Sequence, residues 1–148
     1  MTEINYFFKN KLIKYLSSIL KTYETNKLFT KTKSKNVFDP VTKFDLKIEK
    51  KIKNIIFKRY PNSNFIGEET SSRRSKKIVK NKLTWIVDPI DGTKNFIIGA
   101  PTWGNLIGLS IDNIPKYGLA FFPSLRKYYY SNGKKSFVFN NLKKKTKL

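Results

Sequence analysis

The sequence predicts an α+β fold in which two helices pack on one face of a mostly antiparallel sheet. Apolar residues recur at helical spacing in the N-terminal part of the chain, and short apolar runs separated by turn residues follow. The 148 residues suffice for a real core, since a domain of this size buries about 70% of its unfolded surface. No segment repeats, so we expect residues 1–148 to form a single domain.

Two amphipathic stretches predict the helices. The first covers residues 3 to about 25, and the second should begin near Thr42, a natural N-cap, and end before Pro61. Between them, residues 26–38 carry lysines without periodicity and are expected to form a mobile basic loop. The inner face of the second helix should consist of Phe44, Ile48, Ile52, Ile55 and Ile56.

The strands follow the second helix. Short apolar runs predict them at residues 64–66, 83–87, 103–111, 117–122, 127–130 and 137–139. Turns are expected at Asp112-Asn113, Pro123-Ser124 and Asn132-Gly133, and a polar loop at residues 71–77. The lysine-rich tail, residues 142–148, is expected to be poorly ordered.

The composition excludes several kinds of site. The chain has neither cysteine nor histidine, so it lacks disulfides, thiolate zinc sites and the usual histidine-assisted nucleophiles. Chemistry must therefore rest on carboxylates, hydroxyls, lysines and hard cations, and oxygen ligands favour Mg²⁺, Mn²⁺ or Ca²⁺.

The charge distribution separates scattered lysines from clustered acids. The net charge of +21 would attract polyanions, but the lysines are spread along the chain and no recognition motif accompanies them, so we expect no specific nucleic-acid partner. Seven of the ten acidic residues lie between residues 39 and 91. No apolar run reaches the roughly 20 residues that span a bilayer, and no signal peptide is recognisable, which predicts a cytoplasmic protein without a membrane partner.

Residues 85–96 read Trp-Ile-Val-Asp-Pro-Ile-Asp-Gly-Thr-Lys-Asn-Phe and hold the densest chemistry. Asp88 should end the strand that precedes it, and Asp91 follows three residues later, so both carboxylates can face one point. Phosphate ester hydrolysis is served by two cations about 3.5–4 Å apart that bridging carboxylates hold. Gly92 and Thr93 should open a short helical turn whose N–H groups hold a phosphate oxygen. The alternative is an ordinary strand-ending turn that binds nothing.

Two further acidic motifs precede this one, Asp-Pro-Val-Thr-Lys-Phe-Asp at residues 39–45 and Gly-Glu-Glu-Thr at residues 67–70. In order and spacing the three motifs resemble the inositol monophosphatase family of magnesium-dependent phosphomonoesterases. Residues 38–42 and 101–104 look more like its bacterial histidinol-phosphatase branch. The resemblance implies the N-terminal half of a layered α/β sugar-phosphatase fold, with a phosphorylated small molecule such as inositol phosphate or histidinol phosphate as substrate.

The resemblance also implies roles for individual residues. Asp45 and Thr93 would be catalytic and orient the attacking water, although Asp45 also fits a capping box with Thr42. Glu69 would be a supporting neighbour of the ligands, and Glu49 a surface or supporting residue. Lys33 and Lys35 match a basic loop that closes over the site in relatives, or else a solvated loop. The Mg²⁺ ligands would be Glu68, Asp88, the Ile90 carbonyl and Thr93, with Asp91 serving a second ion.

The chain departs from the family pattern in length. It stops at Leu148, where relatives usually continue for roughly a hundred residues, and neither Trp85 nor Trp103 precedes the aspartate that would complete a second metal site. We therefore expect a truncated form with weak or no turnover alone. We also expect an exposed apolar surface that favours a homodimer or a complementing C-terminal half.

Three functions compete on these observations. A phosphomonoesterase, or a piece of one, accounts for all three motifs. A non-catalytic metal- and phosphate-binding module, or half of a split enzyme, is the alternative, and a nucleic-acid binder rests on charge alone. Haloacid dehalogenase chemistry does not fit, because its two aspartates are separated by one residue and Asp88 and Asp91 by two.

Overall fold

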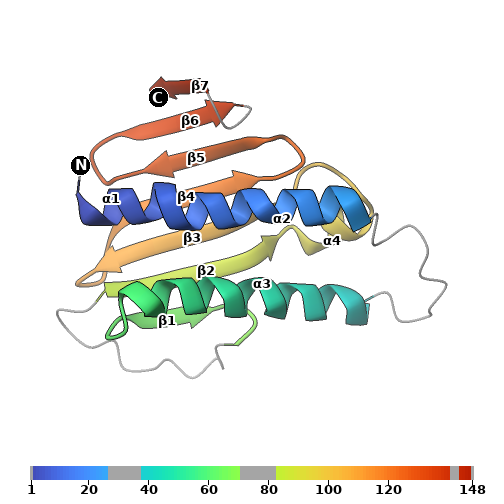
Figure 1. The fold of residues 1–148 in the computed structure, drawn as a ribbon, viewed down its shortest axis with the longest axis horizontal. Helices are drawn as coiled ribbons and strands as arrows, with labels where there is room; N and C mark the ends of the chain where they lie inside the picture. Colours follow the sequence, from blue (N-terminus) through green and yellow to red (C-terminus); the bar gives the residue numbers. More distant parts are fainter. Residues whose placement is uncertain (1, 27–37, 71–82, 141–143, 148) are drawn as a thin grey trace.

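The strands of the computed structural model form one sheet. The structure describes residues 2–26, 38–70, 83–140 and 144–147. Within these, seven strands lie in sequence order, with β1 parallel to β2 and every later neighbour antiparallel, which confirms the predicted mostly antiparallel sheet (Figure 1). They are β1 (Asn64–Gly67), β2 (Leu83–Asp91), β3 (Gly104–Ile111), β4 (Ile114–Phe122), β5 (Lys127–Ser131), β6 (Ser136–Asn140) and β7 (Lys144–Lys147).

The first predicted helix is continuous but not uniform. It consists of α1 (Glu3–Phe7), a π-helical turn η1 (Phe8–Leu12) and α2 (Ile13–Asn26), and the Thr2 hydroxyl caps its start by accepting the Asn5 N–H at 3.3 Å. The π turn has a sequence cause. Phe7 and Phe8 are buried, and so are Leu12 and Ile13, five residues further on. A turn with i to i+5 hydrogen bonds keeps such pairs on one face of the helix.

The second long helix, α3 (Phe38–Arg59), starts earlier than predicted. Because its first residue is Phe38, Thr42 lies inside the helix, and its predicted role as the N-cap is wrong. The inner face is as expected: Ile48, Ile52 and Ile56 are buried, and Phe44 and Ile55 pack against the core. The helix ends before Pro61, as predicted.

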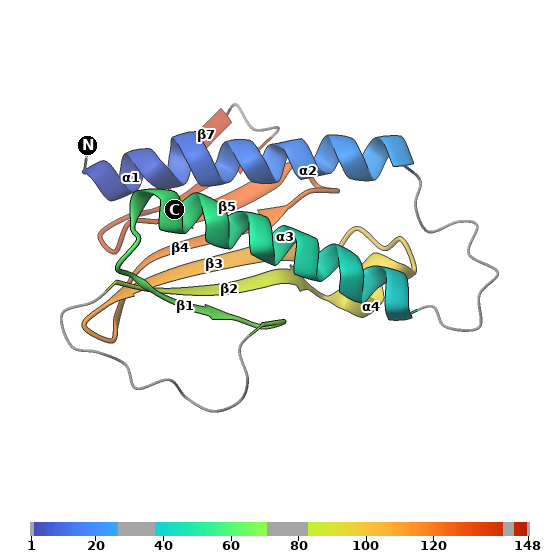
Figure 2. The ribbon, with the colours of Figure 1, turned by 60° about the horizontal axis from the view of Figure 1, so that its bottom comes forward.

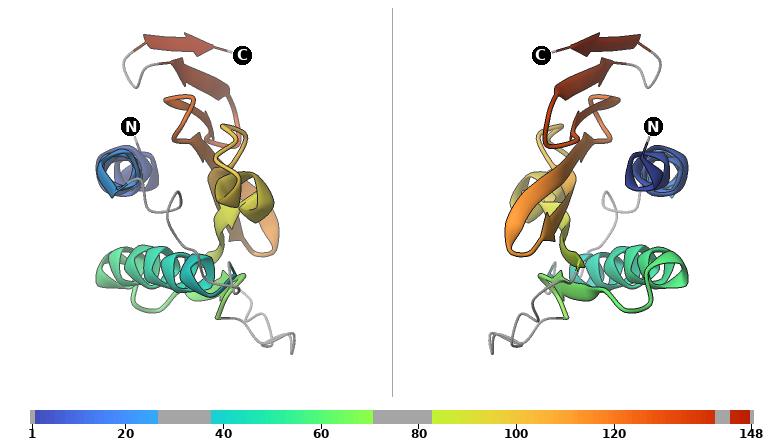
Figure 3. Two further views of the ribbon diagram at one scale, coloured as in Figure 1. Left: turned by 90° about the vertical axis from the view of Figure 1, so that its right-hand side faces the viewer. Right: turned by 90° about the vertical axis from the view of Figure 1, so that its left-hand side faces the viewer.

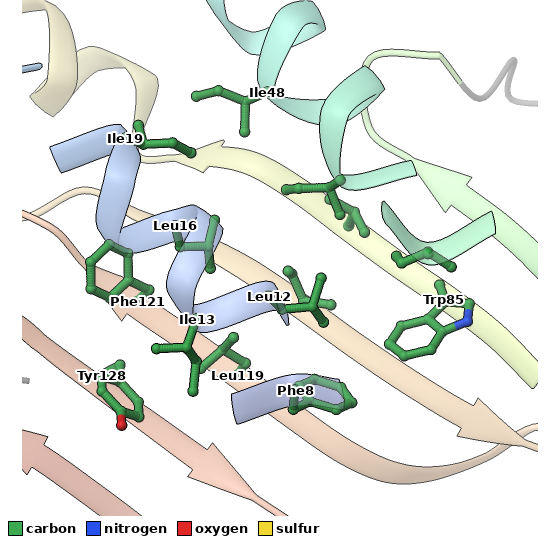
Figure 4. Close-up of a cluster of buried hydrophobic side chains, with 14 of the residues drawn as sticks. Phe8, Leu12, Ile13, Leu16, Ile19, Ile48, Trp85, Leu119, Phe121 and Tyr128 are labelled. Atoms are coloured by element: carbon green, nitrogen blue, oxygen red, sulfur yellow. The ribbon is translucent and has the colours of Figure 1, made fainter. Parts of the chain in front are cut away.

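Both long helices cover the same face of the sheet (Figure 3). The core between the layers combines Phe8, Leu12 and Leu16 of the first helix with Trp85, Leu119 and Phe121 of the sheet, all of them buried (Figure 4). Burial of each such side chain stabilises the fold by about 1.5–3 kcal/mol relative to exposure. α3 joins the same core through Ile48, Ile52 and Ile56, and packs against β2 and η1.

Two departures from the predicted strands concern β2 and β7. β2 continues through a register irregularity between Asp88 and Asp91, so Asp88 does not end the strand as predicted. β7 pairs with β6, and the prediction of a poorly ordered tail is therefore wrong for residues 144–147. The β3–β4 turn is as predicted, because Asp112 and Asn113 both take the left-handed conformation of a two-residue hairpin.

The face of the sheet turned away from the helices carries a hollow of about 530 Å³. Gly108 of β3 and Gly118 of β4 lie opposite each other at its floor, and Ile86 and Tyr129 are 48% and 39% exposed along it. The expected exposed apolar surface is therefore present.

Several predictions fall outside the described residues. These are most of the basic loop at residues 26–38, including Lys33 and Lys35, and the polar loop at residues 71–77. Among the helices that the structure describes, none is both long enough and apolar enough to cross a membrane.

Candidate active site

Two strand ends and two helix starts meet at one end of the sheet. β1 and β2 are parallel, so both carboxyl ends point the same way, and the N-terminal part of α3 and the short helix α4 (Thr93–Ile97) lie at that end (Figures 1 and 2). The three acidic motifs lie on these elements. The fold therefore gathers acids that are up to 46 residues apart in the chain, from Asp45 to Asp91.

Glu68 and Asp88 are direct neighbours. Glu68 follows β1, and its N–H donates to the Val87 carbonyl at 3.0 Å, which continues the β1–β2 pairing by one residue. Burial, together with the hydrogen bond to Glu68 and its charge, raises the pKa of Asp88 to about 7. The charge of Asp91 acts in the same direction. Two carboxyl groups in contact must share a proton or bind a cation.

Asp45 reaches the same place from α3. It is only 3% exposed, and burial raises its pKa to about 7, with further contributions from Glu69, Asp88 and other nearby acids. One carboxylate oxygen of Asp45 and one of Asp88 are buried without a hydrogen-bond partner. Buried oxygens without donors are costly, and a cation would satisfy them.

Glu49 was expected to be a surface or supporting residue, and the structure excludes the surface. Its exposed fraction is 0%. Its carboxylate accepts the Glu69 N–H at 2.9 Å, the Thr70 N–H at 3.1 Å and the Thr70 hydroxyl. Glu49 therefore holds the loop after β1.

The bulge of β2 is held from within the sheet. The side-chain amide of Asn105, a fully buried residue of β3, donates to the Pro89 carbonyl at 2.5 Å. The Thr93 hydroxyl donates to the Ile90 carbonyl at 3.1 Å. Sequence reasoning did not single out Asn105, although an amide in a mostly apolar strand was a signal that could have found it.

Gly92 makes the turn from β2 into α4. Its φ of 81° and ψ of 42° are left-handed, and a Cβ at this position would lie 3.1 Å from the Thr102 carbonyl oxygen. Glycine adopts this conformation at little cost. The predicted helical turn that opens at Gly92 and Thr93 is therefore confirmed.

The structure brings together Asp45, Glu68, Glu69 and Asp88, while Asp91 lies beside Asp88 and is exposed. The Ile90 carbonyl and the Thr93 hydroxyl form a second pair.

The assignment of Asp45 and Thr93 as a catalytic pair stays a prediction, as do the ligand roles. Among the described residues no three acidic side chains lie close enough to hold an ion as they stand. The unpartnered oxygens and the all-oxygen donor set nevertheless fit a hard cation after small side-chain movements.

Comparison with known proteins decides the family. The family model for the inositol monophosphatase family matches residues 2–148. The chain belongs to this family. Inositol monophosphatase 1 of Solanum lycopersicum is 38% identical over 105 residues, which cover 70% of this chain and 38% of the relative. A histidinol-phosphatase of Mycobacterium tuberculosis is 35% identical over 100 residues, which cover 67% of this chain and 37% of that protein.

Solved structures confirm the fold of this inositol monophosphatase family member. Inositol monophosphatase II of Staphylococcus aureus matches with a TM-score of 0.74 and 26% identity, over 95% of this chain and 50% of that one. A structure of SaIMPase-II with bound inositol monophosphate matches with a TM-score of 0.67 and 27% identity, over 93% and 47%. The chain thus spans about half the length of these solved structures and less of the two curated relatives.

Proposed function

We propose that this chain supplies the cation- and phosphate-binding part of a Mg²⁺-dependent phosphate monoester hydrolase. The observation that carries the proposal is the pair of buried carboxylate oxygens on Asp45 and Asp88 that lack donors among surrounding acids. A protein gains no stability from such an arrangement alone, and a divalent cation supplies the missing positive charge. The names of the relatives favour a phosphorylated small molecule, with inositol phosphate or histidinol phosphate as candidates.

The proposed ligands are those that the family resemblance implies. Glu68, Asp88, the Ile90 carbonyl and the Thr93 hydroxyl would hold one Mg²⁺, and Asp91 would face a second. Bound Mg²⁺ lowers the pKa of water and stabilises negative charge on phosphate oxygens. Thr93 would turn its hydroxyl away from its hydrogen bond to the Ile90 carbonyl when both become ligands.

The remaining groups position the reactants. Asp45, with its unpartnered oxygen, would accept a hydrogen bond from water and take its proton, and the Thr93 hydroxyl would orient that water. The backbone at Gly92 and Thr93 would hold a phosphate oxygen. Turnover by this 148-residue chain alone should be weak or absent, because neither Trp85 nor Trp103 is followed by the aspartate that would complete a second ion site in the family pattern. A cytoplasmic location and completion by a second copy or a complementing C-terminal half belong to the same proposal.

Calorimetric titration with Mg²⁺, paired with phosphate release from inositol phosphate and histidinol phosphate, tests the proposal. We expect saturable Mg²⁺ binding that Glu68→Gln weakens. The control Glu3→Gln, which changes an exposed acid paired with Arg59, should leave binding unchanged. Absence of Mg²⁺ binding by the wild type would refute the proposal. Mg²⁺-dependent binding of phosphate esters without any release would favour the non-catalytic module.

A further inference from the structure

We infer that Glu49 is a positioning residue that fixes the loop bearing Glu68 and so sets the place of one cation ligand. The inference rests on the proposed function, because it concerns the ligand geometry of that site. Both carboxylate oxygens of Glu49 are hydrogen-bonded to the loop. One of its carboxylate oxygens accepts the Glu69 N–H, and the other accepts both donors of Thr70.

The contact joins two elements that are distant in sequence. Glu49 is on α3, and its partners lie 20 and 21 residues later in the loop after β1. Hydrogen bonds from backbone N–H groups to a carboxylate are roughly twice as strong as those between neutral groups. The carboxylate is fully buried, so water does not compete for it. The loop is therefore tied to the helix rather than only to its own strand.

Gly67 is shaped to the same carboxylate. A Cβ at Gly67 would collide with the carboxyl carbon and with both carboxyl oxygens of Glu49. A side chain at this position must therefore displace Glu49 or the strand end. The close approach lets the carboxylate pass beneath the end of β1 and reach the two N–H groups beyond it.

Glu68 is consequently fixed on both sides. Before it, Gly67 pairs with Val87, and the Glu68 N–H donates to the Val87 carbonyl at 3.0 Å. After it, Glu69 is held by Glu49. Since Asp45 lies one helical turn before Glu49 on α3, one helix both supplies Asp45 and fixes the loop with Glu68. Loss of Glu49 should release the second side of Glu68 while leaving Asp88 in place.

The test combines hydrogen exchange of the metal-free protein with calorimetric Mg²⁺ affinity. In Glu49→Ala, the Glu69 and Thr70 amides should exchange at least about tenfold faster, and Mg²⁺ should bind about 10–100-fold more weakly, as is usual when a group supporting a ligand is lost. Glu49→Gln should fall between wild type and Ala, because its amide nitrogen is a donor that cannot accept an N–H. These readouts do not depend on turnover.

A control must show that general destabilisation of α3 does not by itself speed up loop exchange or weaken Mg²⁺ binding. Ile52→Ala, at a fully buried position of α3 that is not hydrogen-bonded to the loop, is the matched control. It should lower the melting temperature while the folded protein keeps wild-type exchange at Glu69 and Thr70 and wild-type Mg²⁺ affinity. If Ile52→Ala weakens Mg²⁺ binding as much as Glu49→Ala does, Glu49 has no specific positioning role.

A double-variant comparison keeps the inference testable if Glu49→Ala folds poorly. Gly67→Ala should weaken Mg²⁺ binding in the wild-type background, because the added Cβ displaces the Glu49 carboxylate. It should have little further effect in Glu49→Gln, because the side chain at position 49 has then already lost part of its hydrogen bonding to the loop. Additive effects would overturn the matched fit of Gly67 and Glu49. Unchanged loop exchange in both Glu49 variants would overturn the positioning role alone. Failure of wild-type Mg²⁺ binding, with faster loop exchange in the variants, would instead remove the proposed function and with it the role toward a cation.

Discussion

The two acidic segments of the site are held in opposite ways. The loop of Glu68 depends on α3, whose Glu49 supplies the acceptor for two of its N–H groups. The bulge of Asp88 depends on its own sheet, through Asn105 of β3 and the local bond between Thr93 and Ile90. The first segment therefore depends on the packing of α3 as well as on strand pairing, whereas the second depends on the sheet alone. One cation site is therefore built from a segment tied to α3 and a rigid segment tied to the sheet.

Removal of the cation should affect both segments and have the largest effect. Asp45 and Asp88 have pKa values raised from 3.8 to about 7, so the metal-free folded protein retains protons that the unfolded chain releases. This contribution to stability is fully present below about pH 4 and is lost as the pH rises to about 7, a change on the order of a few kcal/mol. Urea unfolding in EDTA at several pH values measures it, and Mg²⁺ should restore stability most at high pH.

The comparison with Asp45→Asn isolates that effect from the change in overall charge. The variant lacks one titrating group, so its metal-free stability should fall less between pH 5 and 8 than that of the wild type. Parallel pH profiles for the two proteins would show that Asp45 titrates normally.

In the rigid segment, replacement of Asp88 should weaken Mg²⁺ binding without unfolding the protein. Asp88→Asn should weaken Mg²⁺ binding by at least about 100-fold, equivalent to about 2.7 kcal/mol. The metal-free variant should be more stable than wild type at pH 8, since a buried like charge is removed. Calorimetry and thermal unfolding measure the two effects. Glu3→Gln, which changes an exposed acid paired with Arg59, is the control and should leave Mg²⁺ binding unchanged.

Loss of the support for the bulge should have a smaller effect. Asn105→Ala leaves the Pro89 carbonyl without its donor, which should lower the free energy of unfolding by about 2 kcal/mol. Ser110→Ala on the same strand removes only a long 3.5 Å contact to the Thr84 carbonyl, and should cost within about 0.5 kcal/mol. Equal costs for the two variants would mean that Asn105 does not support the bulge. Chemical denaturation compares them.

The smallest expected effect concerns the turn that ends the rigid segment. Gly92→Ala forces a left-handed alanine against the Thr102 carbonyl and should destabilise the protein by about 1–2 kcal/mol. Gly118→Ala, whose added Cβ meets nothing within 4 Å, should be near neutral and is the matched control. Thermal unfolding of both variants measures the difference. A neutral Gly92→Ala would show that the turn adapts.

The sequence predicted the acidic motifs of the site better than the residues that hold those motifs in place. The helices and most strands follow from apolar spacing. The motifs that carry Asp45, Glu68 and Asp88 were recognisable because each is a short local string, and the roles of these residues stay a prediction. Glu49 was misjudged as possible surface because its partners lie 20 residues away, and only tertiary packing reveals its burial.

Two local departures had physical causes that the pattern did not resolve. Pairing with β3 carried β2 past Asp88, although Pro89 and Asp91 suggested a turn. The N-terminus of α3 moved to Phe38, because a good capping residue such as Thr42 does not prevent a helix from starting earlier.

The π turn of the first helix sets a rotational phase for the N-terminus. Phe7 lies 5.1 Å from the Tyr60 ring and 5.7 Å from Trp85, measured between ring centroids, and Glu3 pairs with Arg59. One residue more or fewer within η1 would turn α1 by about 100° relative to α2. The first helical turn would then face solvent instead of the end of α3. The number of residues in η1 therefore decides whether the start of the chain contacts α3, the helix that carries Asp45 and Glu49.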